Sequence, residues 1–117
     1  MGRLTTHVLD LVSGSPASGM RIDVATLDGP ARRPVLSTRT NRDGRPDGAL
    51  REGNEFTAGV WQLEFHVAEY FKARGVALSQ PPFLDVVTVR FGVANPDEHH
   101  HVPLLVTPWS YSTYRGS

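Results

Sequence analysis

Apolar and polar residues alternate with a period of two along the first segment of the chain, residues 4–11. This period predicts a β-strand with one buried face and one outward face. The face predicted to be buried carries Leu4, Thr6 and Val8, and the outward face carries Thr5, His7 and Leu9.

Strand-like patterns recur later in the chain, separated by runs of Gly, Pro, Asn, Asp and Ser that favour turns. The clearest is segment 61–66, where Trp61, Leu63 and Phe65 alternate with polar residues. The others are 20–24, 35–40, 87–93, 101–106 and 109–114. Between two of them, residues 67–74 favour a helix of about two turns, and Gly75 is placed to cap its C-terminus.

Seven or eight short strands with one short helix predict an all-β fold, an antiparallel β-sandwich that forms a single domain over residues 1–117. Pro103 cannot donate a hydrogen bond to a neighbouring strand, so we expect its strand at an edge or a bulge. Leu9 and Leu105 fall on the outward faces of their strands. Leucines on an outward face suggest that another subunit covers it.

Composition narrows the possible functions. The chain has no cysteine, which excludes disulfides, thiolate catalysis and cysteine-ligated metal sites. It has 12 basic and 12 acidic residues, and this balance gives no electrostatic reason to expect nucleic acid or membrane binding. The N-terminal segment lacks the apolar core of a signal peptide, and no apolar run is long enough to cross a membrane. We therefore expect a cytoplasmic protein.

Two histidines and one arginine are the candidate chemical groups. His7 and His101 each lie within an apolar strand and share its outward face with a leucine. An imidazole is the usual general base near neutral pH, because its ordinary pKa is about 6.5. Arg45 follows Asp43-Gly44 in the turn-rich segment 41–48, and a tight loop there would fix a planar donor. For each of these residues taken singly, a structural role or simple surface exposure is the simpler interpretation.

The other histidines have plainer interpretations. His99 and His101 could share a face as a metal site, but zinc needs about three or four protein ligands and the others are not apparent. We interpret His99 and His100 as part of a polar loop that leads into a strand. We interpret His66 as a solvent-side strand residue without a functional role.

The same segments resemble the 5-hydroxyisourate hydrolases, which are transthyretin-like proteins. The resemblance covers nearly the whole chain, and its most specific part is the closing Tyr-Arg-Gly-Ser. It is carried by residues 4–10 (LTTHVLD), 14–17 (GSPA), 40–45 (TNRDGR), Tyr70-Phe71, 101–108 (HVPLLVTP) and 111–117 (YSTYRGS).

This resemblance implies a transthyretin-like sandwich, assembled as a homotetramer with active sites at the dimer–dimer interface. It implies hydrolysis of 5-hydroxyisourate in urate breakdown, with no cofactor and no metal. The residues that match the family's catalytic set are His7, Arg45 and His101. The matching substrate-binding tail is Tyr114, Arg115, Gly116 and Ser117.

Three other functions stay open at this point. A transthyretin-like carrier would share the fold, but a binding tunnel for apolar ligands favours apolar walls over two histidines and an arginine. An interaction module would leave the strand histidines and the tail unexplained. A metallohydrolase would use His99 and His101.

Overall fold

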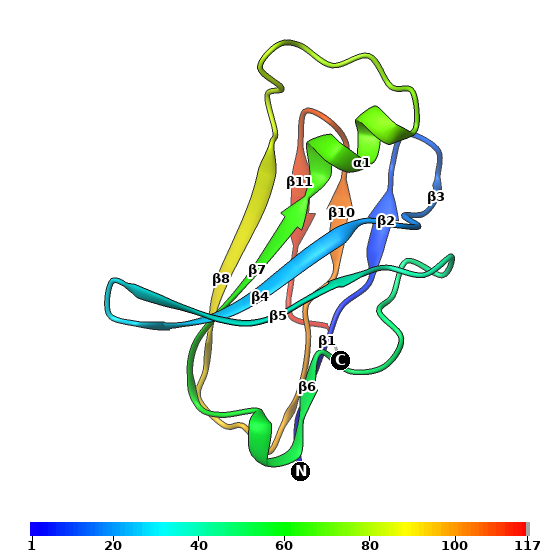
Figure 1. Ribbon diagram of the computed structural model, residues 1–117. Coiled ribbons are helices and arrows are strands. Elements are labelled where there is room, and N and C mark those ends of the chain that lie inside the picture. Colours follow the sequence, from blue (N-terminus) through cyan, green and yellow to red (C-terminus); the bar gives the residue numbers. More distant parts are fainter. Residues whose placement is uncertain (117) are drawn as a thin grey trace.

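The computed structural model describes residues 1–116 as a β-sandwich with a single α-helix (Figure 1). The helix α1 spans Val67–Ala73, which confirms the predicted position, and Gly75 follows it with a positive φ of 80°. A short 3-10 helix, η1, spans Gly53–Glu55. The strands are β1 (Arg3–Thr5), β2 (Val8–Asp10), β3 (Ser15–Pro16), β4 (Arg21–Asp28), β5 (Ala31–Arg39), β6 (Arg51–Glu52), β7 (Gly59–His66), β8 (Val86–Val93), β9 (His99–His101), β10 (Leu104–Val106) and β11 (Tyr111–Thr113).

The strands form two layers. One layer is a long antiparallel sheet in the order β5-β4-β7-β8. The other layer consists of two short sheets, β6-β1-β9 and β11-β10-β2-β3. The sandwich agrees with the expected fold class. It is not wholly antiparallel, because β1 pairs with β9 and β2 pairs with β10 in parallel.

The predicted strand 4–11 is interrupted at Thr6 and His7, and the predicted strand 101–106 is interrupted at Val102 and Pro103. The two interruptions lie side by side and keep their backbone hydrogen bonds. The Val102 N–H donates to the Thr5 carbonyl at 2.9 Å, and the Leu104 N–H donates to the His7 carbonyl at 2.9 Å. The predicted strand 101–106 is divided between β9, which lies at the edge of its sheet as expected, and β10, which lies between β11 and β2. The strand breaks at the proline, where no N–H is present.

The core lies between the layers, and the alternation read from the sequence describes it well. Trp61, Leu63 and Phe65 are buried, as are Leu4 and Val8 on the inner face of the N-terminal segment. Thr6 is also buried on that face, where its hydroxyl donates to the Val102 carbonyl at 2.6 Å. Helix α1 is tied to the short sheets by the Tyr70 hydroxyl, which donates to the Asp10 carboxylate at 2.8 Å.

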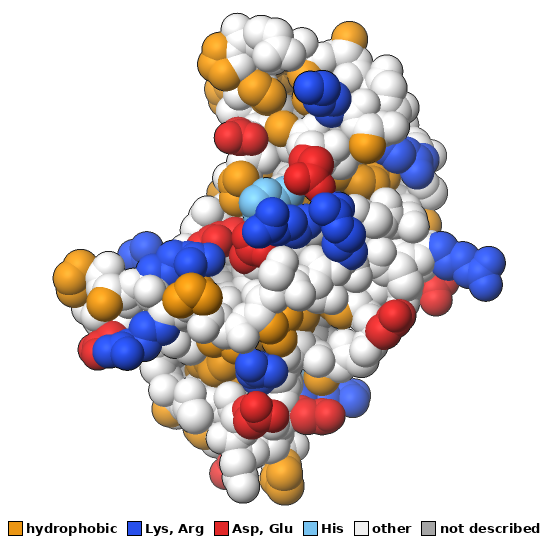
Figure 2. Space-filling model, viewed as in Figure 1, with side chains coloured by type: hydrophobic (Ala, Val, Ile, Leu, Met, Phe, Trp, Pro, Cys, Tyr) orange, Lys and Arg blue, Asp and Glu red, His pale blue; other side chains and the backbone are white. Residues whose placement is uncertain are grey.

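The outer face of the long sheet carries paired charges. Figure 2 shows basic and acidic side chains side by side around a histidine on this face of the molecule. His66 lies in β7 on this outer face, as predicted, and is half-buried there, with its ring 2.9 Å from Asp23. Burial raises the pKa of Asp23, but hydrogen bonds from Ser37, His66 and Arg21 outweigh this and lower it to about 2.

Strand β5 is the outer edge of the long sheet and is irregular. Its register against β4 shifts between Val24 and Ala25, which pair with Leu36 and Pro34, so that Val35 forms a β-bulge. Among the described residues, no helix is both long enough and apolar enough to span a membrane.

Candidate active site

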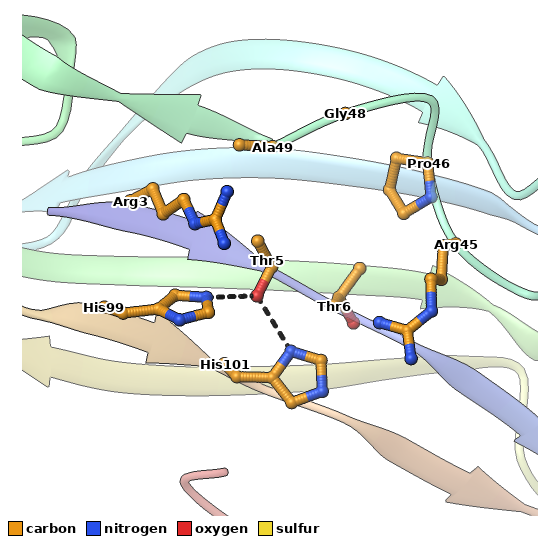
Figure 3. A pocket seen from close by; sticks show the side chains of 9 residues that line it. All are labelled: Arg3, Thr5, Thr6, Arg45, Pro46, Gly48, Ala49, His99 and His101. Carbon is orange, nitrogen blue, oxygen red and sulfur yellow. Dashed lines mark hydrogen bonds between the residues drawn. The ribbon is translucent and has the colours of Figure 1, made fainter. Parts of the chain in front are cut away.

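A cavity of about 370 Å³ opens beside β1 and β9, the two parallel strands of the small three-stranded sheet (Figure 3). Strand β1 contributes Arg3 and Thr5, and strand β9 contributes His99 and His101. The cavity is completed by Thr6, Arg45, Pro46, Gly48 and Ala49. The residues that line it are therefore mostly polar or cationic, and they come from both ends and from the middle of the chain.

The register of the parallel pair explains which side chains reach the cavity. Thr5 lies opposite His101, and Arg3 lies opposite His99. Side chains of a strand alternate between its two faces, so these four share one face. The intervening His100 points into the core, where it is 4% exposed and its ring lies edge-on to Phe56 at 5.4 Å. The interpretation of His99 and His100 as a polar loop is wrong, because both lie in β9.

Thr5 forms a bridge between the two cavity histidines. Its hydroxyl oxygen lies 2.8 Å from His99 Nε2 and 2.8 Å from His101 Nδ1. The two imidazole rings are 6.2 Å apart between centroids. Figure 3 shows the hydroxyl between them, so that the three side chains form a continuous hydrogen-bonded chain along the cavity.

Arg45 is held by the tight loop that the sequence predicted. The Asn41 N–H donates to the Arg45 carbonyl at 2.8 Å, and the Asn41 side chain accepts from the Asp43 N–H at 2.8 Å. The Val8 N–H donates to the Gly44 carbonyl at 2.8 Å, which docks the loop on β2. Figure 3 shows the Arg45 guanidinium group on the His101 side of the cavity.

His7 lies next to this cluster, at the interruption between β1 and β2, and is not among the residues that line the cavity. Burial and the positive charge of Arg45 lower its pKa, against a smaller raising effect of Asp43. The pKa of His101 is lowered by burial and by the charges of Arg45, His99 and His7. The charges of His7, Arg45 and His101 are therefore close enough to act on one another.

The pKa of His99 is also lowered, by burial and then by the charges of Arg3, His100 and Arg115. All three histidines at this site thus titrate below the ordinary value of 6.5. Near pH 7 they are mainly neutral, which leaves each ring one nitrogen able to accept a proton.

Residues of the C-terminal tail contact two different parts of the molecule. The Gly116 N–H donates to the His101 carbonyl at 2.7 Å, and a Cβ on Gly116 would lie only 2.7 Å from the His101 ring. Tyr114 and Arg115 instead line a second cavity of about 280 Å³ next to β8. Gly116 thus contacts His101 from within the same chain, and Arg115 donates to the His99 carbonyl at 3.3 Å. Ser117 lies outside the described residues.

Three residues at this site, Arg3, Thr5 and His99, were not predicted as site residues from the sequence. The period of two places Thr5 on the face of His7, and that signal was available. The pairing of β1 with β9, which brings His99 to Thr5, depends on a register between residues more than ninety positions apart. Among residues 1–116, no three His, Asp or Glu side chains are grouped to hold a metal ion.

Comparison with known proteins gives these residues a context. Residues 4–116 match the model of the HIUase/Transthyretin family. The chain belongs to this family. It is 54% identical to the 5-hydroxyisourate hydrolase of Ralstonia nicotianae, with all of both chains covered.

Two solved structures of the family are similar to the fold. A crystal structure of (S)-allantoin synthase matches with a TM-score of 0.93 and 50% identity, over 99% of this chain and 44% of that longer one. Sea bream transthyretin in complex with thyroxine matches with a TM-score of 0.85 and 28% identity, over 97% and 94% of the two chains. Proteins named as enzymes and a transthyretin in complex with thyroxine therefore share this fold.

Replacement of Gly44 by alanine tests how the loop holds Arg45. Gly44 has a φ of 75°, and a Cβ there would lie 2.5 Å from the Val8 carbonyl. Gly14→Ala is a matched control, because Gly14 has a φ of 70° with nothing within 4 Å. We expect the control to lower the free energy of unfolding by about 1–2 kcal/mol from backbone strain alone.

Gly44→Ala should cost clearly more in urea denaturation. It should also raise the pKa of His7 and His101, measured by NMR, because Arg45 moves away from them. Equal losses of stability in the two variants, with unchanged histidine pKa values, would show that Gly44 does not position the arginine.

Proposed function

We propose that the protein hydrolyses 5-hydroxyisourate to 2-oxo-4-hydroxy-4-carboxy-5-ureidoimidazoline, a step of urate degradation. The observation that carries this proposal is that Arg45 and His101 line one cavity and that His7 lies beside them, where the charge of Arg45 acts on both rings. A chain 54% identical over its full length to a 5-hydroxyisourate hydrolase supports the choice of substrate. No cofactor is required for the reaction.

The reaction needs a base, a proton donor and a stabiliser of negative charge. Water adds its oxygen to a ring carbonyl carbon, and an imidazole of His7 or His101 takes the proton that water loses. The carbon–nitrogen bond of the tetrahedral intermediate then breaks, and the leaving nitrogen takes up a proton from the imidazolium. The new carbonyl group and the added oxygen end as a carboxylate.

Arg45 orients the substrate and stabilises the developing oxyanion. A guanidinium group carries several fixed N–H donors and stays charged at neutral pH, so it can bind an imide-like oxygen of the ring. Donors that are already aimed at the position of the developing charge are often the largest contribution to catalysis. The Tyr114–Ser117 tail, which includes Arg115 and Gly116, completes the substrate pocket, in part from a neighbouring subunit.

A carrier function is the alternative, because transthyretin binds thyroxine on this fold. The chain is only 28% identical to the sea bream carrier, against 54% to the hydrolase. The cavity also carries two arginines and two histidines, and apolar walls would suit an apolar hormone better. These differences favour the hydrolase over the carrier and over an interaction module without chemistry.

We propose that the active protein is a homotetramer, a dimer of dimers with its active sites at the dimer–dimer interface. His7 and Leu9 lie on one face of the N-terminal segment, and His101 and Leu105 lie on the matching face of β9 and β10. All four are half-buried within the single chain. A second subunit over this face would cover the leucines and exclude water from the histidines.

The experiment that tests the function mixes the purified protein with fresh 5-hydroxyisourate and follows the ultraviolet absorbance. Wild-type protein should accelerate the decay above the spontaneous rate. His101→Ala or His7→Ala should lower turnover roughly 10²- to 10⁴-fold, the usual contribution of general base assistance. Arg45→Ala should also lower it, because the charge stabilisation is lost.

His66→Ala is the matched control, since it removes an imidazole from the other sheet. It should keep wild-type turnover, and a chelator should leave the wild-type rate unchanged. If 5-hydroxyisourate decays no faster with wild-type protein than without it, the proposed hydrolase activity is refuted. Full loss of activity on addition of the chelator would instead favour a metallohydrolase.

The pH dependence of kcat/KM should show an acid limb below pH 6.5. The base acts as neutral imidazole, and burial and Arg45 lower the pKa of both His7 and His101 from 6.5. Activity is therefore present above the lowered pKa and is lost as pH falls through it. In Arg45→Ala the limb of the residual activity should move upward, because a positive charge beside both rings is gone. An acid limb at the same pH in Arg45→Ala as in wild type would show that the charge of Arg45 does not act on the base.

The assembly is tested by sedimentation velocity. Wild-type protein should sediment with the mass of four chains. Leu105→Glu should lower that mass and the turnover together, since a carboxylate would have to be buried in the interface. Leu27→Glu places the same charge at a half-buried leucine of β4, in the other sheet, and should preserve the tetramer. A monomer with full activity would contradict an active site that lies between subunits.

A further inference from the structure

The hydroxyl group of Thr5 is hydrogen-bonded to two titratable rings at once, and the proposed mechanism gives this hydroxyl no role. Its oxygen lies 2.8 Å from His99 Nε2 and 2.8 Å from His101 Nδ1. A threonine hydroxyl has a single hydrogen, so it can donate to only one of the two nitrogens. The other nitrogen must then carry a proton and donate to the oxygen. The proton positions on the two rings are therefore linked.

Both rings could also donate to the hydroxyl oxygen, which has two lone pairs, but the hydroxyl hydrogen would then bind neither ring. When the hydrogen takes part in one of the two bonds and the rings are neutral, two arrangements remain. In the first, His101 donates from Nδ1 to Thr5, and Thr5 donates to His99 Nε2. His101 Nε2 is then unprotonated and can act as a base. In the second, His99 donates from Nε2 and Thr5 donates to His101 Nδ1. His101 then carries its proton on Nε2 and cannot accept another there.

We propose that Thr5 is a positioning residue that holds His101 in its base form by donating its hydroxyl hydrogen to His99. This inference deepens the proposed hydrolysis and rests on it for its catalytic meaning. Thr5 does not need to touch the substrate. It acts through His101, whose proton position it selects.

The charges around the two rings favour the first arrangement. Figure 3 shows the Arg45 guanidinium on the side of His101 away from the Thr5 bond. A guanidinium offers only donors, so an unprotonated Nε2 suits that side better than an N–H. His7 and His99 are the other titratable groups whose charges act on His101.

The surroundings of His99 act in the same direction. Arg3 from β1, Arg115 from the tail and the neighbouring His100 oppose a positive charge on its ring, and burial does so as well. A neutral His99 can present an unprotonated Nε2 to Thr5, whereas a doubly protonated one cannot. Burial and the nearby positive charges thus favour a neutral His99, which can accept from Thr5 at Nε2.

The arrangement has a further consequence during the reaction. When His101 Nε2 takes a proton from water, the ring becomes an imidazolium that still donates from Nδ1 to Thr5. The hydroxyl is oriented for this bond because its own hydrogen is already engaged by His99. Hydrogen bonds to a charged group contribute about 1.5–3 kcal/mol. Loss of the bond should therefore lower kcat by roughly 10- to 100-fold.

The first test compares Thr5→Val with Thr5→Ser in steady-state kinetics. Valine keeps the shape and removes the hydroxyl, while serine keeps the hydroxyl. We expect Thr5→Val to lower kcat by roughly 10- to 100-fold with KM changed by less than about threefold. Thr5→Ser should recover most of kcat. A Thr5→Val enzyme with wild-type kcat, or a Thr5→Ser enzyme as slow as the valine variant, would overturn the proposal.

The second test needs no substrate, and so it is independent of the proposed function. ¹⁵N NMR of the histidine rings at pH 7.5 reports which nitrogen carries the proton. In wild-type protein we expect both His99 and His101 to be protonated on Nδ1. In Thr5→Val we expect His101 to become a mixture of the two tautomers. Protonation of either His99 or His101 on Nε2 in the wild-type protein would refute the proposed arrangement.

Thr6→Val is the matched control for the NMR measurement. It removes the neighbouring hydroxyl, whose bond goes to the Val102 carbonyl, and should leave the His101 tautomer unchanged. If Thr5→Val does not fold, His99→Ala replaces it, because the hydroxyl then loses its acceptor and His101 should become mixed in the same way. If wild-type protein does not hydrolyse 5-hydroxyisourate, the proposed function fails, and the NMR result still decides the linkage.

Discussion

The parallel pairing of residues 3–10 with residues 99–106 is the constraint on which the site depends. It sets Thr5 opposite His101 and Leu4 opposite His100, so that one set of alternate side chains faces the cavity and the other the core. A shift of this register by one residue would reverse the two faces. The buried Leu4 and Val8 prevent such a shift, because their exposure would cost about 1.5–3 kcal/mol each. Core packing therefore holds the histidines in place.

The interruption of both strands also helps to position the residues of the site. Pro103 removes an N–H at the point where the opposite segment passes through Thr6 and His7. The neighbouring backbone groups remain paired, through the bonds from Val102 to Thr5 and from Leu104 to His7. His7 is therefore anchored through its carbonyl at the break between β1 and β2. The loop that carries Arg45 docks on Val8, immediately after this point.

Much of this could be predicted from the sequence. Local periodicity was sufficient for the buried faces of β7 and the N-terminal segment, and for helix α1 with Gly75 after it. The dense turn signals of 41–48 correctly indicated an ordered loop under Arg45. Local patterns failed for His99 and for Thr5, since their roles depend on a pairing between distant segments. They placed His66 correctly on an outer face but did not give its partner, because Asp23 lies on another strand.

The irregular edge strand β5 affects how this protein can meet other chains. Its bulge at Val35, its proline at position 34 and the side chains of Arg32, Arg33 and Arg39 interrupt the row of backbone groups that an incoming strand would need. This side of the long sheet is thus protected against uncontrolled strand addition and fibril growth. Substitution of Pro34 by a β-branched residue would remove part of that protection without any change near the histidines.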